Sequence, residues 1–162
     1  MFRLLLSYVE VLNEESTMKI SARNQLVGQV DLIQQGKVNS EVYIKLNSGY
    51  TMVSVITNDA VKDLKLQCGD SVVAFFKSSC VLVTTDITLN ISARNKFQGT
   101  ITNLQVGEIN AQLYINIGNN DMVVSVITLN SVRALGIKMG MSVSAIIKAS
   151  DVMIGKQQGE MK

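Results

Sequence analysis

The chain contains one sequence unit in two copies. Residues 20–83 align with residues 91–154 at a constant shift of 71 positions without a gap, and about 25 of the 64 aligned positions are identical. Ile-Ser-Ala-Arg-Asn at 20–24 returns at 91–95, and Val-Ser-Val-Ile-Thr at 53–57 returns at 124–128. The copies are too few and too long for a solenoid, so the pattern predicts two compact domains of the same fold.

The duplication sets the expected domain bounds. We expect an N-terminal extension over residues 1–17, a first domain over 18–84, a linker over 85–90, a second domain over 91–155 and a tail over 156–162. The apolar run in the extension is interrupted by a glutamate and is too short to span a bilayer. It predicts a short helix or strand packed on the body, and translation starting at Met18 is an alternative.

Each copy has mostly strand-like patterning. Val42, Ile44 and Leu46 alternate with polar or amphipathic residues, and Leu113, Ile115 and Ile117 repeat this, which predicts half-buried strands. The segments 71–83 and 142–154 are rich in Val, Ile and Phe and are also predicted as strands. Gly and Asn at 47–49 and 118–120 favour tight turns.

One short helix is expected in each copy, after the Val-Ile-Thr strand. Apolar residues at spacings of three and four, Ala60, Val61 and Leu64 in the first copy and Val132 and Leu135 in the second, predict one or two turns. The candidate caps are Thr57, Asn58 or Asp59 for the first helix, Asn130 or Ser131 for the second, and Gly136 as its stop. The predicted fold is therefore all-β, a tandem pair of small barrels related to the oligonucleotide-binding (OB) fold. Units this small bury little surface, so we expect the halves to pack together and the protein to oligomerise.

Composition argues against most catalytic functions. The chain has no histidine, and no phosphate loop, paired-carboxylate motif or nucleophile with a histidine base is found, so we expect no enzyme. A net charge of +2 and 5% aromatic residues disfavour nucleic acid as a partner. Cys68 and Cys80 correspond to Met139 and Asp151, which excludes a thiol function shared by both copies. With two cysteines and no secretory signal, we expect the cytoplasm and no membrane partner.

Hydrogen-bond donors are retained in both copies. Arg23 and Arg94 offer planar forks, Lys77 and Lys148 offer point charges, and the serines and asparagines beside the arginines offer further donors. A deprotonated tetrahedral oxyanion only accepts hydrogen bonds, so a selective pocket presents donors and excludes carboxylates. An alternative is equally compatible with these residue types. Serines and asparagines often form turns and arginines are often solvated, and both copies would keep such residues because they have the same fold.

The segments 77–80 and 148–151 are interpreted as strand. On a strand, Lys77 and Ser79 project from one face, and Lys148 and Ser150 repeat that arrangement. Asp151 then lies on the opposite face from Ser150, which keeps its carboxylate away from a bound anion.

These motifs resemble a known family. The motifs are Ile-Ser-Ala-Arg-Asn with Gly four residues later, Val-Ile-Thr, Leu-x-x-Gly and a final Lys-Ala-Ser-Asp-Val-Met. Together they are similar to the Mop or molbindin family, the molybdate-binding class of TOBE domains, in its tandem di-Mop form. The resemblance covers about 130 residues in two complete copies. It implies OB-type barrels, trimers of the tandem chain, and molybdate or tungstate bound between subunits without any catalytic cofactor or metal cation.

The resemblance also implies the binding residues. In the family the anion lies between the Ser-Ala-Arg-Asn segment of one domain and the Lys-x-Ser segment of a neighbour. This pairs 21–24 with 148–150 and 92–95 with 77–79, and Ser78-Ser79-Cys80 departs from the family-like Ala149-Ser150-Asp151. The implied residues are Ser21, Ala22, Arg23, Asn24, Lys77, Ser78, Ser79, Ser92, Ala93, Arg94, Asn95, Lys148, Ala149 and Ser150, with Thr57 and Thr128 as possible additional hydroxyl donors or else helix caps.

The first hypothesis is therefore an intracellular protein that stores or buffers molybdate or tungstate. The alternative is a molybdate-sensing effector domain that acts with a separate regulator or transporter partner. A nucleic-acid-binding barrel rests on fold analogy alone. Tungstate and sulfate share the shape and the acceptor-only chemistry of molybdate, so the residue types do not separate them.

Overall fold

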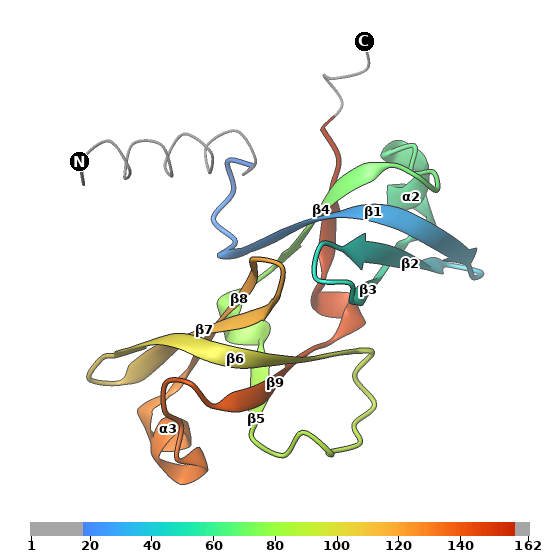
Figure 1. The fold of residues 1–162 in the computed structure, drawn as a ribbon. Coiled ribbons are helices and arrows are strands. Elements are labelled where there is room, and N and C mark those ends of the chain that lie inside the picture. The colour runs from blue at the N-terminus through green and yellow to red at the C-terminus, as the bar shows by residue number, and fades with distance from the viewer. Residues whose placement is uncertain (1–17, 158–162) are drawn as a thin grey trace.

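The computed structural model describes residues 18–157, which form two curled five-stranded antiparallel sheets (Figure 1). The predicted all-β pair of OB-like barrels is confirmed. The prediction of a short packed element within residues 1–17 lies outside the described residues.

The first copy contains β1 (Asn24–Gln35), β2 (Asn39–Leu46), β3 (Thr51–Thr57), α2 (Asn58–Asp63), β4 (Ser71–Phe76), a 3-10 turn (Ser78–Cys80) and β5 (Leu82–Thr84). The second contains β6 (Asn95–Val106), β7 (Asn110–Gly118), β8 (Asp121–Thr128), α3 (Leu129–Leu135), β9 (Ser142–Ile147), a 3-10 turn (Ala149–Asp151) and β10 (Met153–Gly155).

The two copies exchange their last strands. The strand orders are β10-β4-β1-β2-β3 and β5-β9-β6-β7-β8, so β5 completes the second sheet and β10 completes the first. In Figure 1 the red end of the chain runs alongside the first sheet, next to β4. The Ser54 hydroxyl on β3 donates to the carbonyl of Val152 at 2.6 Å, and the Ser125 hydroxyl donates to that of Val81 at 2.7 Å. The predicted domain bounds therefore describe the repeated sequence units and stay a prediction for the structural domains, because each sheet takes one strand from the other copy.

The prediction of uninterrupted strands at 71–83 and 142–154 is wrong. Each segment is divided by a 3-10 turn after its first six residues, at Ser78–Cys80 and Ala149–Asp151. The turn redirects the chain from one sheet to the other, which a single straight strand could not do.

The predicted alternation is confirmed in the central strands. Val42, Ile44, Leu113 and Ile115 are fully buried, and their neighbours in sequence are half-buried or exposed. β1 pairs with both β2 and β4, and its register shifts between Val30 and Leu32; β6 repeats this geometry. Such irregularities bend a strand and allow one sheet to curl into a barrel.

A glycine is required on β6 where this strand lies close against β7. A Cβ at Gly99 would lie 2.5 Å from the carbonyl oxygen of Asn116 on β7, and Gly28 is equally crowded by β2. The shared glycines of the two copies at these positions therefore reflect close contact between strands.

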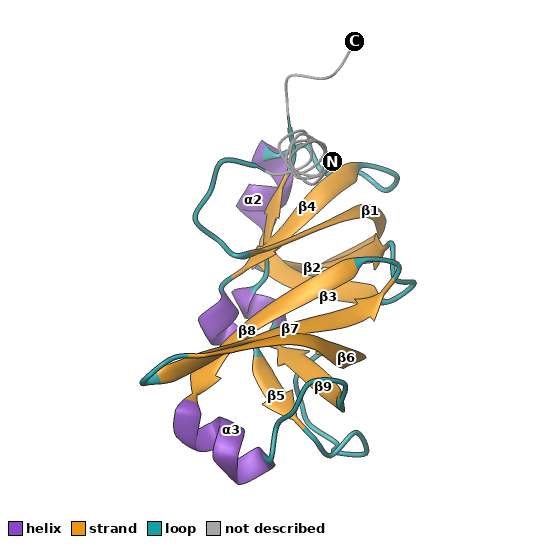
Figure 2. Cartoon of the chain, turned by 60° about the vertical axis from the view of Figure 1, so that its left-hand side comes forward, coloured by secondary structure: helices purple, strands orange, loops and turns teal. Residues whose placement is uncertain are grey.

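The turns and helices follow the sequence with one correction. Gly49, Asn119 and Asn120 have positive φ, as the turn residues predict. The Thr57 hydroxyl accepts from the N–H of Ala60 and caps α2, whereas Thr128, and not the expected Asn130 or Ser131, caps α3 by accepting from the N–H of Ser131. Gly136, with φ of 62°, ends α3 as predicted. The two helices lie at opposite ends of the molecule (Figure 2).

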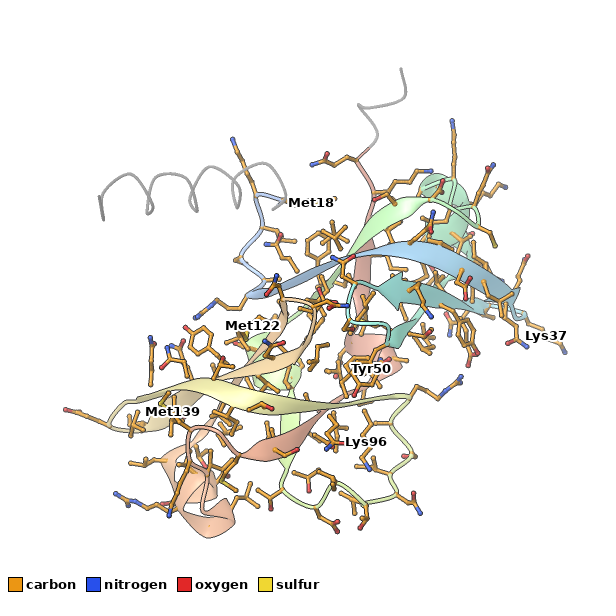
Figure 3. The ribbon with its side chains drawn as sticks, viewed as in Figure 1. Met18, Lys37, Tyr50, Lys96, Met122 and Met139 are labelled. Carbon is orange, nitrogen blue, oxygen red and sulfur yellow. The ribbon has the colours of Figure 1, made fainter. Side chains whose placement is uncertain are left out.

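Two buried asparagines join the barrels. The Asn24 carboxamide donates to the carbonyl of Val124 at 2.8 Å and accepts from its N–H at 2.7 Å. Asn95 makes the equivalent pair of bonds to Val53, both at 2.8 Å. On another part of this interface the Tyr50 hydroxyl donates to the carbonyl of Gln98 at 3.0 Å, and Figure 3 shows Tyr50 where the two halves meet. The two barrels therefore pack against each other, as their small size led us to expect.

Candidate anion-binding site

The first pocket lies where the chain enters β1 and leaves β4. Because Asn24 pairs with Phe76 in the antiparallel sheet, the residues before β1 meet the residues after β4. The cavity has a volume of about 240 Å³. Its lining residues are Ile20, Ser21, Ala22, Arg23, Lys77, Ser78, Ser79 and Met153.

The second pocket occupies the equivalent place in the second copy. Asn95 pairs with Ile147, so the residues before β6 meet those after β9. This cavity is larger, at about 670 Å³. Its lining residues are Val55, Ser79, Cys80, Leu82, Ile91, Ser92, Ala93, Arg94, Ile146, Lys148, Ala149, Ser150 and Asp151.

Within one chain, each pocket is formed mainly by two segments of the same copy, and the expected pairing between different copies is found only at Ser79. The segment 21–23 shares a pocket with 77–79, and the segment 92–94 shares one with 148–150. Both members of each pair come from the same copy, because the β1–β4 and β6–β9 pairings place them together. Ser79 is an exception, since it also lines the second pocket.

The interpretation of 77–80 and 148–151 as strand is also wrong. Ser78–Cys80 and Ala149–Asp151 are 3-10 turns, in which side chains project around the axis at three residues per turn. Asp151 is consequently not turned away from the site and lines the second pocket beside Ser150. The described residues that line the first pocket include no carboxylate.

Both arginines are held by the other barrel. Arg23 donates to the Gln112 side-chain oxygen at 2.9 Å and to the Tyr114 hydroxyl at 3.3 Å. Arg94 donates to the Glu41 carboxylate at 2.8 Å and to the Tyr43 hydroxyl at 3.0 Å. The Tyr43 hydroxyl and the negative charge of Glu41 raise the pKa of Arg94 above its already high ordinary value, so its guanidinium stays charged.

Four of the predicted site residues have other roles in the structure. Asn24 and Asn95 use their carboxamides to join the barrels, and Thr57 and Thr128 cap helices; none of the four lines either pocket. The arginine partners were not predicted, although identical tyrosines at positions 43 and 114 were an available signal.

Two other features are absent from the part of the chain that the structure describes. Among residues 18–157, no group of three or more Cys, Asp or Glu side chains is placed to hold a metal ion. No helix in this part of the chain has the length and apolar character needed to cross a membrane.

Comparison with known proteins identifies the family. The TOBE domain matches residues 20–83 and 91–154, both copies over their full length. The chain belongs to the TOBE domain family. Its fold is similar to that of the cytoplasmic molybdate-binding protein ModG in a crystal form with molybdate bound, with a TM-score of 0.83 and 39% identity, covering 86% of this chain and all of that one.

Longer relatives also match. The molybdenum transport protein ModE of Azotobacter vinelandii is 35% identical over 138 residues, which cover 85% of this chain and 51% of ModE. The molybdenum-pterin-binding protein MopA of Rhodobacter capsulatus is 33% identical over 139 residues, covering 85% of this chain and 52% of MopA. The chain therefore spans about half the length of these relatives. The resemblance to the Mop class of TOBE domains is confirmed by these matches.

Proposed function

We propose that this chain binds molybdate or tungstate in its two pockets and releases the anion unchanged. The observation that carries the proposal is the convergence, in each pocket, of a Ser-Ala-Arg segment and a Lys-x-Ser segment that are far apart in sequence. The similarity to a ModG structure that contains molybdate supports the same ligand.

The chemistry of the donors suits a tetrahedral dianion. An arginine supplies two N–H groups from a planar fork, a lysine supplies a second positive charge, and serine hydroxyls donate to the remaining oxygens. Backbone N–H groups at Ala22 and Ala93 are further candidate donors. In the first pocket, whose described lining residues include no carboxylate, the two cations match the two charges of the anion and lower the cost of removing it from water.

We infer that the binding form is a trimer in the cytoplasm that stores or buffers the anion, with the pockets at subunit seams. Four exposed apolar side chains rim the pockets, Ile20 and Met153 at the first and Leu82 and Ile91 at the second. Exposed apolar surface beside a polar cavity is typical of a protein–protein contact. A neighbouring subunit on this surface would shield the bound anion from water.

A second candidate is a molybdate-sensing effector domain that acts with a regulator or transporter. The observation that favours it is the match to ModE, of which this chain spans half. In that case binding would change the association of the chain with a partner, and a pull-down with and without molybdate would detect it.

The direct test replaces both pocket arginines. We expect Arg23→Ala with Arg94→Ala to weaken molybdate binding about 10- to 100-fold, because each substitution removes a charge-assisted hydrogen-bond donor. Isothermal titration calorimetry with sodium molybdate measures the change, with sulfate as the competing anion.

Arg133→Ala is the matched control, because Arg133 is an exposed arginine on α3 and lines neither pocket. It should leave the affinity unchanged. Wild-type protein that takes up no molybdate would refute the proposed function.

A further inference from the structure

The arginines of the two pockets have different partners at one equivalent position. Glu41 on β2 and Gln112 on β7 are related by the repeat shift of 71 positions. Arg94 forms an ion pair with Glu41 at 2.8 Å, whereas Arg23 bonds to the neutral amide of Gln112 at 2.9 Å. The tyrosine partner is the same in both cases, so the charge of this one partner is what differs.

The charge around each pocket follows from this difference. Among residues 18–157, the first pocket has two cations, Arg23 and Lys77, and no carboxylate in its lining or at its arginine. The second has two cations, Arg94 and Lys148, with Asp151 in its lining and Glu41 on its arginine. Of the residues that the structure describes, no carboxylate therefore opposes the two positive charges of the first pocket, and two carboxylates oppose those of the second.

This imbalance acts on an incoming dianion in two ways. Both arginines make hydrogen bonds with an ionised donor, but only the partner of Arg94 also carries a charge. To hold the anion, Arg94 must share or exchange an ion pair with Glu41, whereas Arg23 exchanges a bond to a neutral amide oxygen. In addition, the negative charges of Glu41 and Asp151 repel the anion, and salt screens part of this repulsion.

We propose that the two pockets have different affinities for the oxyanion, that the first pocket fills first, and that Glu41 weakens the second pocket through Arg94. The inference rests on the proposed function and deepens it. Glu41 lines neither pocket and acts as a positioning residue that competes for the guanidinium.

The repeat itself supplies a matched pair of substitutions. Glu41→Gln gives the first copy the residue of the second, and Gln112→Glu does the reverse, in nearly the same volume. Wild-type protein titrated with sodium molybdate should show a tighter and a weaker class of sites. Glu41→Gln should tighten the weaker class about three- to tenfold, and Gln112→Glu should weaken the tighter class by a similar factor.

Variants with a single arginine replaced show which pocket forms which class of binding sites. Arg23→Ala should remove the tighter class and Arg94→Ala the weaker one. The difference in affinity between the two classes of sites should narrow as salt rises from about 0.02 M to about 0.5 M, because screening weakens the repulsion by the half-buried carboxylates of Glu41 and Asp151. A change in packing alone would not produce this salt dependence, and thermal unfolding of the two swap variants checks that the fold is intact.

The outcomes separate the two proposals. A single class of sites that Glu41→Gln leaves unchanged would overturn the inference, while loss of that binding in the double arginine variant would still support molybdate binding. Loss of the weaker class on Arg23→Ala would also overturn it, because the assignment would then be reversed. No binding by the wild type would refute the proposed function itself.

Discussion

Val152→Asp should destabilise the first barrel, although residue 152 belongs to the second copy. The Val152 side chain is 1% exposed, and its carbonyl accepts the Ser54 hydroxyl of β3 immediately before β10 joins β4. A carboxylate here would be buried without a partner, at a cost of about 3–5 kcal/mol. Hydrogen–deuterium exchange should show the largest loss of protection in β3 and β4.

Val81→Asp is the reciprocal variant. Val81 is 2% exposed, accepts the Ser125 hydroxyl of β8 and precedes β5, which pairs with β9. Its effect should fall on β8 and β9, in the second barrel. If each substitution instead loosened the barrel formed by its own copy, the strand exchange would be wrong.

Asn95→Ala should lower the free energy of unfolding by about 2–6 kcal/mol. The Asn95 carboxamide is completely buried and satisfies both the N–H and the carbonyl of Val53 on β3, a strand at the end of its sheet. Alanine would leave two buried backbone groups without their partners, and each such group costs about 1–3 kcal/mol. Urea denaturation followed by circular dichroism measures the loss.

Asn90→Ala is the control for this prediction, because Asn90 is exposed in the segment between the copies. Its effect should stay within about 0.5 kcal/mol. An equally small effect of Asn95→Ala would contradict a structural role for this carboxamide and restore the anion as its candidate partner.

The sequence predicted the barrels but could not predict the exchange of strands. Alternation at Val42 and Ile44 depends on which face of a strand is buried, and burial is a local property of the pattern. The exchanged segments 78–84 and 149–155 are equivalent copies, so either one offers similar side chains to either sheet. Which sheet each segment joins depends on how the two barrels pack, and that is not encoded in any short pattern.

Most of the residues that line the two pockets were expected from the sequence, but their arrangement was not. Arg23 and Lys77 could be chosen because their charge suits an oxyanion. The Glu41–Arg94 ion pair joins residues 53 positions apart on different barrels, so only the packed structure reveals it. Asp151 was placed away from the site because a strand was assumed, and a 3-10 turn points its side chain differently.

Anomalous diffraction at the molybdenum edge, from crystals grown with molybdate, would locate the bound anion. We expect a peak in each pocket, with oxyanion oxygens about 2.7–3.2 Å from the guanidinium nitrogens of Arg23 and Arg94 and from lysine ammonium groups. Peaks confined to other surfaces, with both guanidinium groups still on Gln112 and Glu41, would contradict this expectation.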